Sequence, residues 1–441
     1  MIIALITIAV IIIVYGSVSG LLDKRGVTSA MVFTVAGLVV GTAGLDILNV
    51  DIETSGAEQL CDLALVFLLF SDATRIDLVR LRANLGWPVR LLLIGLPLTI
   101  IAGLIVGSLV FSGLALTSVF LLSTMLCSTD AALGQRVVTD EAVPERVRQA
   151  RDVESGLNDG LAVPFFLVAV DLALVQLSTG VTAAVVQRMA EQIGWGLFAG
   201  VLAGALAGLL LRWADERRWL EGQWRQIMPF AAALMAYLVA LELGGSGFIA
   251  AFSGGLTFGY FSRHHGLRVT SLNEDIGGVL AGFTWIGFGA LAVGMVLPSI
   301  TIQVVIYAAL SLTLIRMVPV ALALLGTGAR WPTVAFMGWF GPRGLASIVF
   351  ALIALESGIP DADPILTTVV LTILLSVILH GLSSVPLIAA YSRWYDAHVV
   401  EHPGAPEAKP TIMTRLRRQP NEGDMAAAAR ARVAPTSAGG G

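Results

Sequence analysis

The chain has 441 residues, of which 56% are hydrophobic and 13% are charged, and its mean hydropathy is +0.84. An ordinary soluble domain carries about 25% charged residues, so a single water-facing globule could not bury this much apolar surface. The composition excludes a soluble enzyme, a nucleic-acid-binding protein and a disordered chain, and it indicates an all-α membrane protein. The two cysteines, Cys61 and Cys127, lack the spacing of a metal site, and no cofactor is expected.

Thirteen apolar segments have about the length that a helix needs to cross a bilayer, which is roughly 20 residues. They lie at 2–21, 27–43, 58–72, 91–111, 114–134, 151–177, 194–211, 228–243, 247–261, 274–298, 301–323, 332–356 and 365–391. We therefore expect about 13 transmembrane helices.

The connecting loops differ in charge. Basic residues gather in the loops 73–90, 212–225 and 262–273, whereas the loops 44–57 and 358–364 are acidic. With thirteen spans, every basic loop lies on one side of the membrane and both acidic loops lie on the other. The positive-inside rule then predicts an outside N-terminus and a cytoplasmic C-terminus in the inner (plasma) membrane.

Spans one to six and eight to thirteen, joined by the seventh, would cross the membrane in opposite directions, which is the geometry of an inverted repeat. We expect a first six-helix repeat at 1–177, a linker helix and cytoplasmic loop at 178–225, and a second six-helix repeat at 226–395. Residues 396–441, rich in Pro, Ala, Gly and Arg towards their end, are expected to be a disordered cytoplasmic tail.

Two corresponding spans carry residues that interrupt helices. In the fifth span, Ser128, Thr129 and Asp130 can compete with the backbone for hydrogen bonds, and in the twelfth, proline and glycines occur together at 341–344. Paired interruptions point to a site near the bilayer midplane where the two helices cross, with Asp130 at a half-helix N-terminus. A continuous fifth helix that ends early, and a second break in the last span instead, remain open.

The sixth span carries a polar stripe. Glu154, Ser155, Asn158 and Asp159 follow spacings that place them on one face of a helix. Two carboxylates, a hydroxyl and an amide supply the hard oxygen ligands that a small cation binds. A cytoplasmic helix start explains Glu154 but not Asp159, because continuous apolar sequence follows Asp159.

Other ionisable residues within the spans need partners. An unpaired Arg343 inside an apolar span would be costly, so we expect it to pair with Glu154 and to pin two helices rather than bind substrate. Asp72 ends the third span, where a site ligand and a helix-end acid facing water are about equally good explanations. Asp171 and Arg316 lie within spans without an assignable partner.

Together these motifs resemble those of the bacterial NhaP-type sodium/proton antiporters of the monovalent cation/proton antiporter family, relatives of the animal sodium/proton exchangers. The resemblance rests on Ser128-Thr129-Asp130 and on the segments 154–160 and 341–346, in this order and spacing. In length and hydropathy it covers roughly residues 1–395.

The resemblance implies a role for each site residue. Asp159 would alternately hold a cation and a proton, while Glu154, Ser155 and Thr129 would help to coordinate the cation. Asn158 would steady Glu154 and Arg343. Asp72 stands where family members usually carry an acid, often a glutamate, and Asn158 resembles the electroneutral branch. A homodimer is also implied.

Competition for one carboxyl group gives a mechanism. A carboxyl in a low-dielectric cleft resists ionising, and a bound sodium ion offsets that cost only for the deprotonated form. If the protein changes its open side only when Asp159 is neutralised, sodium or another alkali cation is exchanged for protons across the bilayer. A potassium/proton antiporter and a cation channel remain alternatives, whereas the motifs of a membrane-embedded enzyme, HExxH and GxSxG, are missing.

Overall fold

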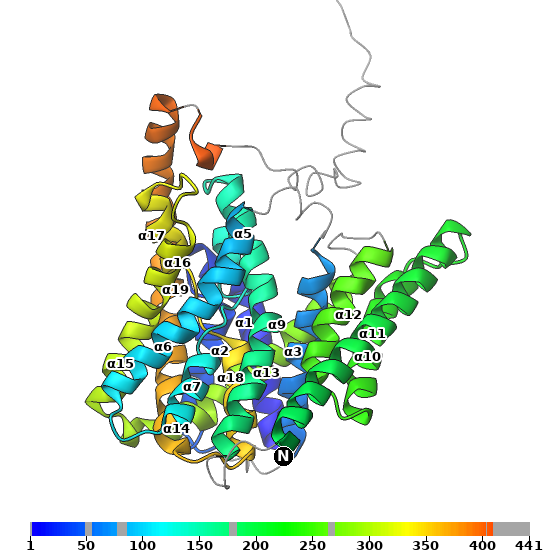
Figure 1. Cartoon of the computed structure of the whole chain (residues 1–441), viewed down its shortest axis with the longest axis horizontal. Helices are drawn as coiled ribbons and strands as arrows, with labels where there is room; N and C mark the ends of the chain where they lie inside the picture. Colours follow the sequence, from blue (N-terminus) through cyan, green and yellow to red (C-terminus); the bar gives the residue numbers. More distant parts are fainter. Residues whose placement is uncertain are drawn as a thin grey trace, which may run out of the picture.

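The computed structural model describes residues 2–48, 55–76, 86–175, 183–262, 270–402 and 404–408. Within these ranges the regular structure is helical, without β-strands. Most of the long helices lie side by side with their axes roughly aligned (Figure 1). In this described part, eight helices are long and apolar enough to cross a membrane. The chain is therefore a multi-pass, all-α membrane protein.

The helices have the following bounds in chain order. The first half contains α1 (Ile2–Lys24), α2 (Ser29–Val40), α3 (Ser55–Thr74), α5 (Gly86–Arg90), α6 (Leu96–Val110), α7 (Leu116–Met125), α8 (Gln135–Thr139) and α9 (Glu145–Val175). The second half contains α10 (Ala183–Glu216), α11 (Trp224–Glu242), α12 (Gly247–Ser262), α13 (Ser271–Gly287), α14 (Gly294–Val296), α15 (Ile302–Leu312), α16 (Leu314–Ala323), α17 (Trp331–Trp339), α18 (Leu345–Glu356) and α19 (Ala362–Glu401). Short π-helical turns, η1 (Leu91–Gly95) and η2 (Phe288–Val293), continue α5 into α6 and α13 into α14, and two 3₁₀ turns follow later, η3 (Leu297–Ser299) and η4 (Pro406–Ala408).

The predicted all-α fold is confirmed, and each of the thirteen predicted segments contains helix. Of the three shortest segments, 58–72 and 247–261 fall within α3 and α12, and 228–243 extends one residue beyond the end of α11. The count of thirteen crossings and the division into two inverted repeats stay predictions.

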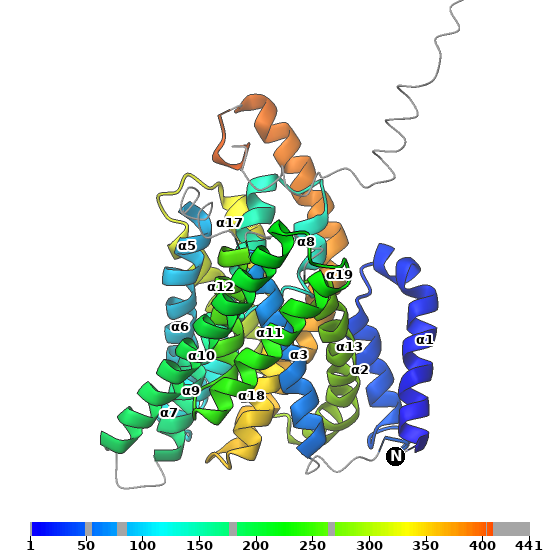
Figure 2. The same cartoon turned by 90° about the vertical axis from the view of Figure 1, so that its right-hand side faces the viewer.

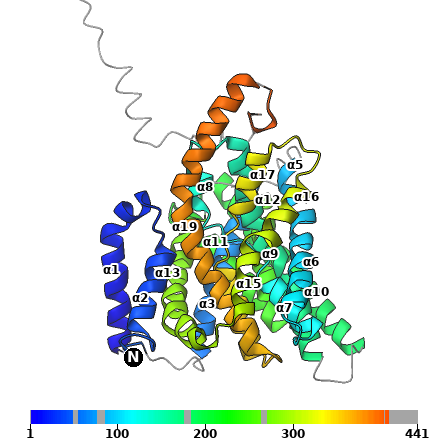
Figure 3. The same cartoon turned by 90° about the vertical axis from the view of Figure 1, so that its left-hand side faces the viewer.

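The outer helices have the surface expected of a protein whose solvent is lipid. Helix α1 has no buried residue although it is strongly apolar, and it stands at the edge of the bundle beside α2 (Figures 2 and 3). A soluble protein rarely exposes so large an apolar surface, whereas a bilayer accepts it because the helix satisfies its own backbone hydrogen bonds.

Close packing of α3, α9 and α12 positions the polar stripe of α9. A side chain at Gly255 of α12 would overlap the backbone of Phe70 in α3, and one at Gly160 of α9 would overlap the ring of Phe252 in α12. Buried apolar side chains join the three helices at this point: Ala73, Ile76, Leu92, Val153, Leu157 and Phe252. The C-terminal end of α3 is therefore held next to the stripe.

The predicted start of a disordered tail at residue 396 is wrong. Helix α19 continues to Glu401 and extends past the other helices (Figure 1), and the following η4 packs back on the bundle. The buried carboxylate of Glu407 accepts hydrogen bonds from the Arg330 N–H (2.8 Å) and from the Thr333 hydroxyl (3.0 Å). Glu407 thereby caps the N-terminus of α17, a tertiary contact that composition cannot indicate. Residues 409–441 lie outside the described residues.

Candidate functional site

Two helices are broken where the sequence predicts it. Helix α7 ends at Met125 and the chain enters α8 only at Gln135, while α17 ends at Trp339 and α18 begins at Leu345. Helix α19 is continuous, so the alternative of a second break in the last span is wrong. The fifth and twelfth spans are thus the interrupted pair.

The two breaks bond directly to each other. The Asp130 N–H donates to the Pro342 carbonyl oxygen at 2.8 Å. Pro342 has no N–H of its own to donate, and it disfavours helical backbone at the residue before it. At Gly344 an added side chain would overlap the Asp130 carboxylate. Glycine is required there because the two chain segments cross without room for a methyl group.

Fixed charges compensate the ends of the broken helices. The Asp130 carboxylate accepts from the backbone N–H groups of Leu345 and Leu133, each at 2.9 Å. Arg343 donates to the carbonyl oxygens of Cys127 (3.1 Å) and Ser128 (2.8 Å). A negative charge therefore lies at the N-terminus of α18 and a positive charge beyond the C-terminus of α7, as helix dipoles favour. The prediction that Asp130 lies at a half-helix N-terminus is confirmed.

Glu154 does not pair with Arg343, and that prediction is wrong. Its two carboxylate oxygens contact Arg151 of the same helix and Arg316 of α16, and all three side chains are at most 2% exposed. The depth and charge of the two arginines in the sequence make Arg316 as good a partner for Glu154 as Arg343. The rotation of each helix about its axis decides which arginine faces Glu154. Because a guanidinium group contacts each oxygen, this geometry favours a supporting role for Glu154, while the cation-ligand role that the resemblance implies stays a prediction.

Asn158 connects α9 to the first break. Its amide nitrogen donates to the Thr129 hydroxyl at 3.2 Å, rather than steadying Glu154 and Arg343 as the resemblance implies. Within the described part of the chain, its buried carbonyl oxygen has no hydrogen-bond partner. Asn158 and Thr129 therefore present oxygen atoms at the point where α9 meets the crossing.

Asp159 lies at the centre of the polar groups. It lies close enough to Asp130, Asp72 and the Ser128 side chain to interact with them electrostatically. Its Oδ1 atom is buried and, among the residues described, has no hydrogen-bond partner. A buried polar atom without a partner is uncommon and needs an explanation, and a proton or cation that occupies the site for part of the time is one.

Asp72 borders the site from α3. Its Cβ lies 3.6 Å from the position that a Cβ would take on Gly156 of α9, beside the stripe. The Asp72 side chain is 24% exposed, whereas Ser155 and Thr129 are buried. Asp72 therefore occupies the more exposed edge of the site.

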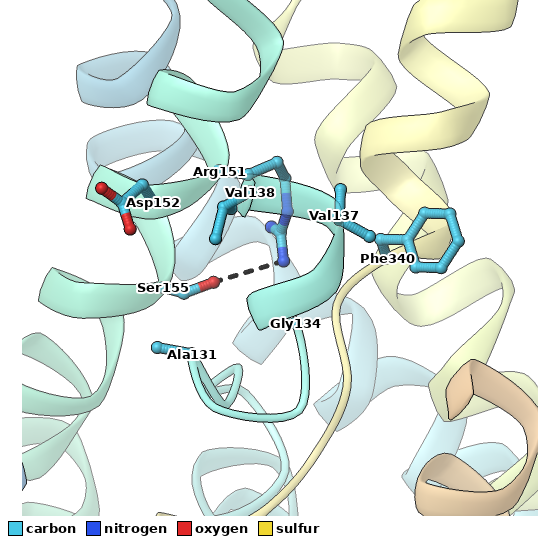
Figure 4. Close-up of a pocket in the computed structure, with 8 residues that line it drawn as sticks. All are labelled: Ala131, Gly134, Val137, Val138, Arg151, Asp152, Ser155 and Phe340. Atoms are coloured by element: carbon cyan, nitrogen blue, oxygen red, sulfur yellow. Dashed lines mark hydrogen bonds between the residues drawn. The ribbon is translucent and has the colours of Figure 1, made fainter. Parts of the chain in front are cut away.

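A small cavity adjoins the stripe. It has a volume of about 10 Å³ and is lined by Ala131, Gly134, Val137, Val138, Arg151, Asp152, Ser155 and Phe340. Figure 4 shows Arg151 bonded to the Ser155 hydroxyl, at 3.3 Å, above the loop that carries Ala131. The cavity has room for about one water molecule beside these polar groups.

The residues missed by sequence reasoning are the two arginines around Glu154. Arg151 precedes Glu154 by three residues on one helix, which is a contact spacing. Arg316, an arginine within an apolar span, required an acidic partner. The sequence therefore indicates that Arg151 and Arg316 need acidic partners, but it does not identify Glu154 as the acid that pairs with both.

Broken helices that cross beside buried carboxylates are the arrangement in which secondary transporters hold ions and substrates. The chain belongs to the sodium/hydrogen exchanger family of transmembrane proteins, whose family model matches residues 5–390. The family resemblance seen in the motifs is confirmed.

Two curated relatives are bacterial antiporters. The K(+)/H(+) antiporter NhaP2 of Shewanella sp. (strain MR-4) is 27% identical over 375 residues, which cover 82% of this chain and 62% of the relative. The Na(+)/H(+) antiporter ApNhaP of Aphanothece halophytica is 26% identical over 339 residues, which cover 73% of this chain and 62% of that protein. The matched part thus spans about three fifths of the length of these relatives.

A solved structure has the same fold. The sodium proton antiporter MjNhaP1 from Methanocaldococcus jannaschii superposes with a TM-score of 0.71 over 89% of this chain and 99% of that chain, at 19% sequence identity. The interrupted helices of this protein therefore belong to a known antiporter fold.

Proposed function

We propose that this protein is a secondary antiporter that exchanges sodium or another alkali cation for protons, with both ions competing for Asp159. The observation that carries the proposal is the buried Asp159 oxygen without a hydrogen-bond partner, placed where α9 meets the two broken helices. Asp130, Arg343 and Glu154 are already bonded to other groups, so Asp159 is the carboxylate of the crossing best able to exchange its partner.

The surrounding residues have separate roles in this proposal. Ser155, Thr129 and Asp72 supply oxygen ligands, with Asp72 on the more exposed side. Asp130 and Arg343 hold the crossing together. When Asp159 is neutralised by either ion, its desolvation cost falls, and one group of helices can move against the other to expose the site on the opposite side.

The test uses the purified protein in sealed liposomes that contain a pH-sensitive dye. Native protein is expected to move protons when an alkali-cation gradient is imposed, and Asp159→Asn is expected to abolish this movement while the protein still elutes as a single folded species. Asp171→Asn is the matched control, because Asp171 is a buried acid on the same helix but lies three turns further along it. Undiminished exchange by Asp159→Asn would refute the assignment.

The same assay decides between cations and between mechanisms. Sodium, potassium and lithium are titrated separately, because carboxylate and hydroxyl ligands accept all three and the two relatives above carry different cation names. A cation channel would conduct cations without coupled proton movement. Proton movement that follows only the membrane potential, and disappears when the potential is clamped, would favour the channel.

We also propose that exchange is electroneutral. Asn158 stands beside Asp159 without a titratable group, and in this proposal Asp159 alone exchanges one monovalent cation for one proton, while the other carboxylates keep their charge. Clamping the membrane potential with a potassium ionophore should then leave the rate of sodium/proton exchange unchanged. A rate that changes with the clamped potential would contradict this stoichiometry.

The proposal includes the location, assembly and orientation of the protein. We propose that it lies in the plasma membrane as a homodimer, with the N-terminus outside and the C-terminus in the cytoplasm. The positive-inside rule supports this orientation, and the start of α1 lies at the opposite end of the molecule from the end of α19 (Figure 1). Labelling of single cysteines introduced near each terminus tests the orientation, and mass measurement in detergent tests the dimer.

A further inference from the structure

A positively charged side chain, Arg75, lies next to Asp72. Arg75 follows the C-terminal end of α3, and its Nη1 is 3.7 Å from Oδ1 of Asp72. Its Nη2 contacts the carboxylate of Glu274 on α13. All three side chains are between 24% and 32% exposed, so the group lies at the exposed edge of the site and not in its buried interior.

Glu274 is held in place independently of Arg75. Its Oε1 accepts hydrogen bonds from the hydroxyls of Ser71 (3.0 Å) and Thr270 (2.9 Å), which leaves Oε2 for the guanidinium. Arg75 therefore has a fixed anchor on α13 and a looser contact with Asp72. Asp152 of α9 is a further carboxylate that interacts with Arg75.

This arrangement places a tethered guanidinium and an incoming alkali cation in competition for one carboxylate. A guanidinium cannot lose its charge in a protein, so Arg75 always presents a positive charge to Asp72. The closer it lies to Asp72, the weaker the attraction of that carboxylate for a second cation. By pairing with the other side of the guanidinium, Glu274 limits this competition.

We propose that Arg75 is a built-in competitor for the cation at Asp72 and that Glu274 is a positioning residue that sets the strength of the competition. The inference rests on the proposed function, in which Asp72 is a cation ligand. It adds a determinant of the apparent cation affinity that acts through Asp72 and leaves Asp159 untouched.

The test measures KM and Vmax for sodium-driven proton movement in liposomes. Arg75→Gln is expected to lower KM by roughly two- to fivefold, the range that a partly exposed ion pair contributes, with Vmax unchanged. Glu274→Gln is expected to raise KM by a similar factor, because the guanidinium is released towards Asp72. The double variant should resemble Arg75→Gln alone, since Glu274 acts only through Arg75.

Two controls separate this effect from others. Arg75→Lys keeps a tethered positive charge and should retain a KM close to that of the native protein. Arg212→Gln removes an arginine that is paired with Glu216 at another helix end and should leave KM unchanged, which excludes a general effect of surface charge.

The outcomes distinguish this inference from the proposed function. If the native protein exchanges ions and Arg75→Gln leaves KM unchanged or raises it, the inference is wrong and the proposed function stands. Independent, additive effects of the two single variants would also overturn it. A loss of Vmax with unchanged KM would assign Arg75 a purely structural role. If the native protein performs no cation/proton exchange, the proposed function itself fails.

Discussion

Replacing Glu154 tests whether that carboxylate supports the site or binds the cation. Glu154→Gln leaves Arg151 and Arg316, both at most 2% exposed, without a negative partner in the interior. Breaking a buried ion pair on one side costs about 3–5 kcal/mol. At about 2 °C per kcal/mol for a large domain, the melting temperature in detergent should fall by roughly 6–10 °C.

The protein carries a suitable reporter for this measurement. Cys61 and Cys127 are both buried, so a dye that becomes fluorescent on reaction with thiols reports unfolding as the temperature rises. Because membrane proteins commonly unfold irreversibly, all variants are heated at one scan rate. Glu191→Gln, at an exposed position, is the control and should melt within about 1 °C of the native protein.

A second substitution strengthens the test. Arg316→Gln added to Glu154→Gln removes one of the two unpaired guanidinium groups and should recover about half of the lost stability. If Glu154→Gln melts like the native protein but no longer transports, Glu154 is a cation ligand and the supporting role assigned here is wrong.

Three further predictions concern the crossing and the competition between ions. Asp130→Ala should lower stability by about 2 kcal/mol, because a buried N–H group (Leu345) and a partly buried one (Leu133) lose their acceptor. Asp130→Asn, which retains one acceptor oxygen, should lose about half of that; equal melting temperatures for the two variants would contradict this. Gly344→Ala should lower both melting temperature and exchange, because its methyl group would overlap the Asp130 carboxylate, while Gly278→Ala, which has open space around it, should alter neither. Lowering the pH in the range where Asp159 is mostly protonated should raise the KM for sodium by about tenfold per pH unit, since protons compete for the same carboxylate, and a KM independent of pH throughout would exclude the competition.

Much of the fold was predictable because hydropathy is a local property. Each bilayer-crossing helix must be apolar over most of its length, so even the short segment 58–72 was recognisable within α3. The breaks were equally accessible, since Pro342 and the polar residues 128–130 disturb a helix wherever it packs. The polar stripe that ends at Asp159 was also predictable, because its residue spacing on one helix is a short-range pattern.

The partners of the charged residues were not predictable in the same way. Glu154 could reach an arginine on any neighbouring helix at similar depth, and only the packed structure selects Arg316 over Arg343. The Asp130 carboxylate bonds to α18, more than 200 residues further along the chain. The docking of Glu407 on α17 likewise depends on tertiary contacts, so composition placed the start of the tail too early.

The most direct test of the account measures proton release on cation binding. Purified protein in weakly buffered detergent solution, at a pH where Asp159 is still protonated, is titrated with sodium while the pH is recorded. If a proton and a cation exclude each other at Asp159, saturating sodium should release up to about one proton per chain, and the Asp159→Asn variant should release none. Sodium binding without proton release, or unchanged release from the variant, would contradict the central claim.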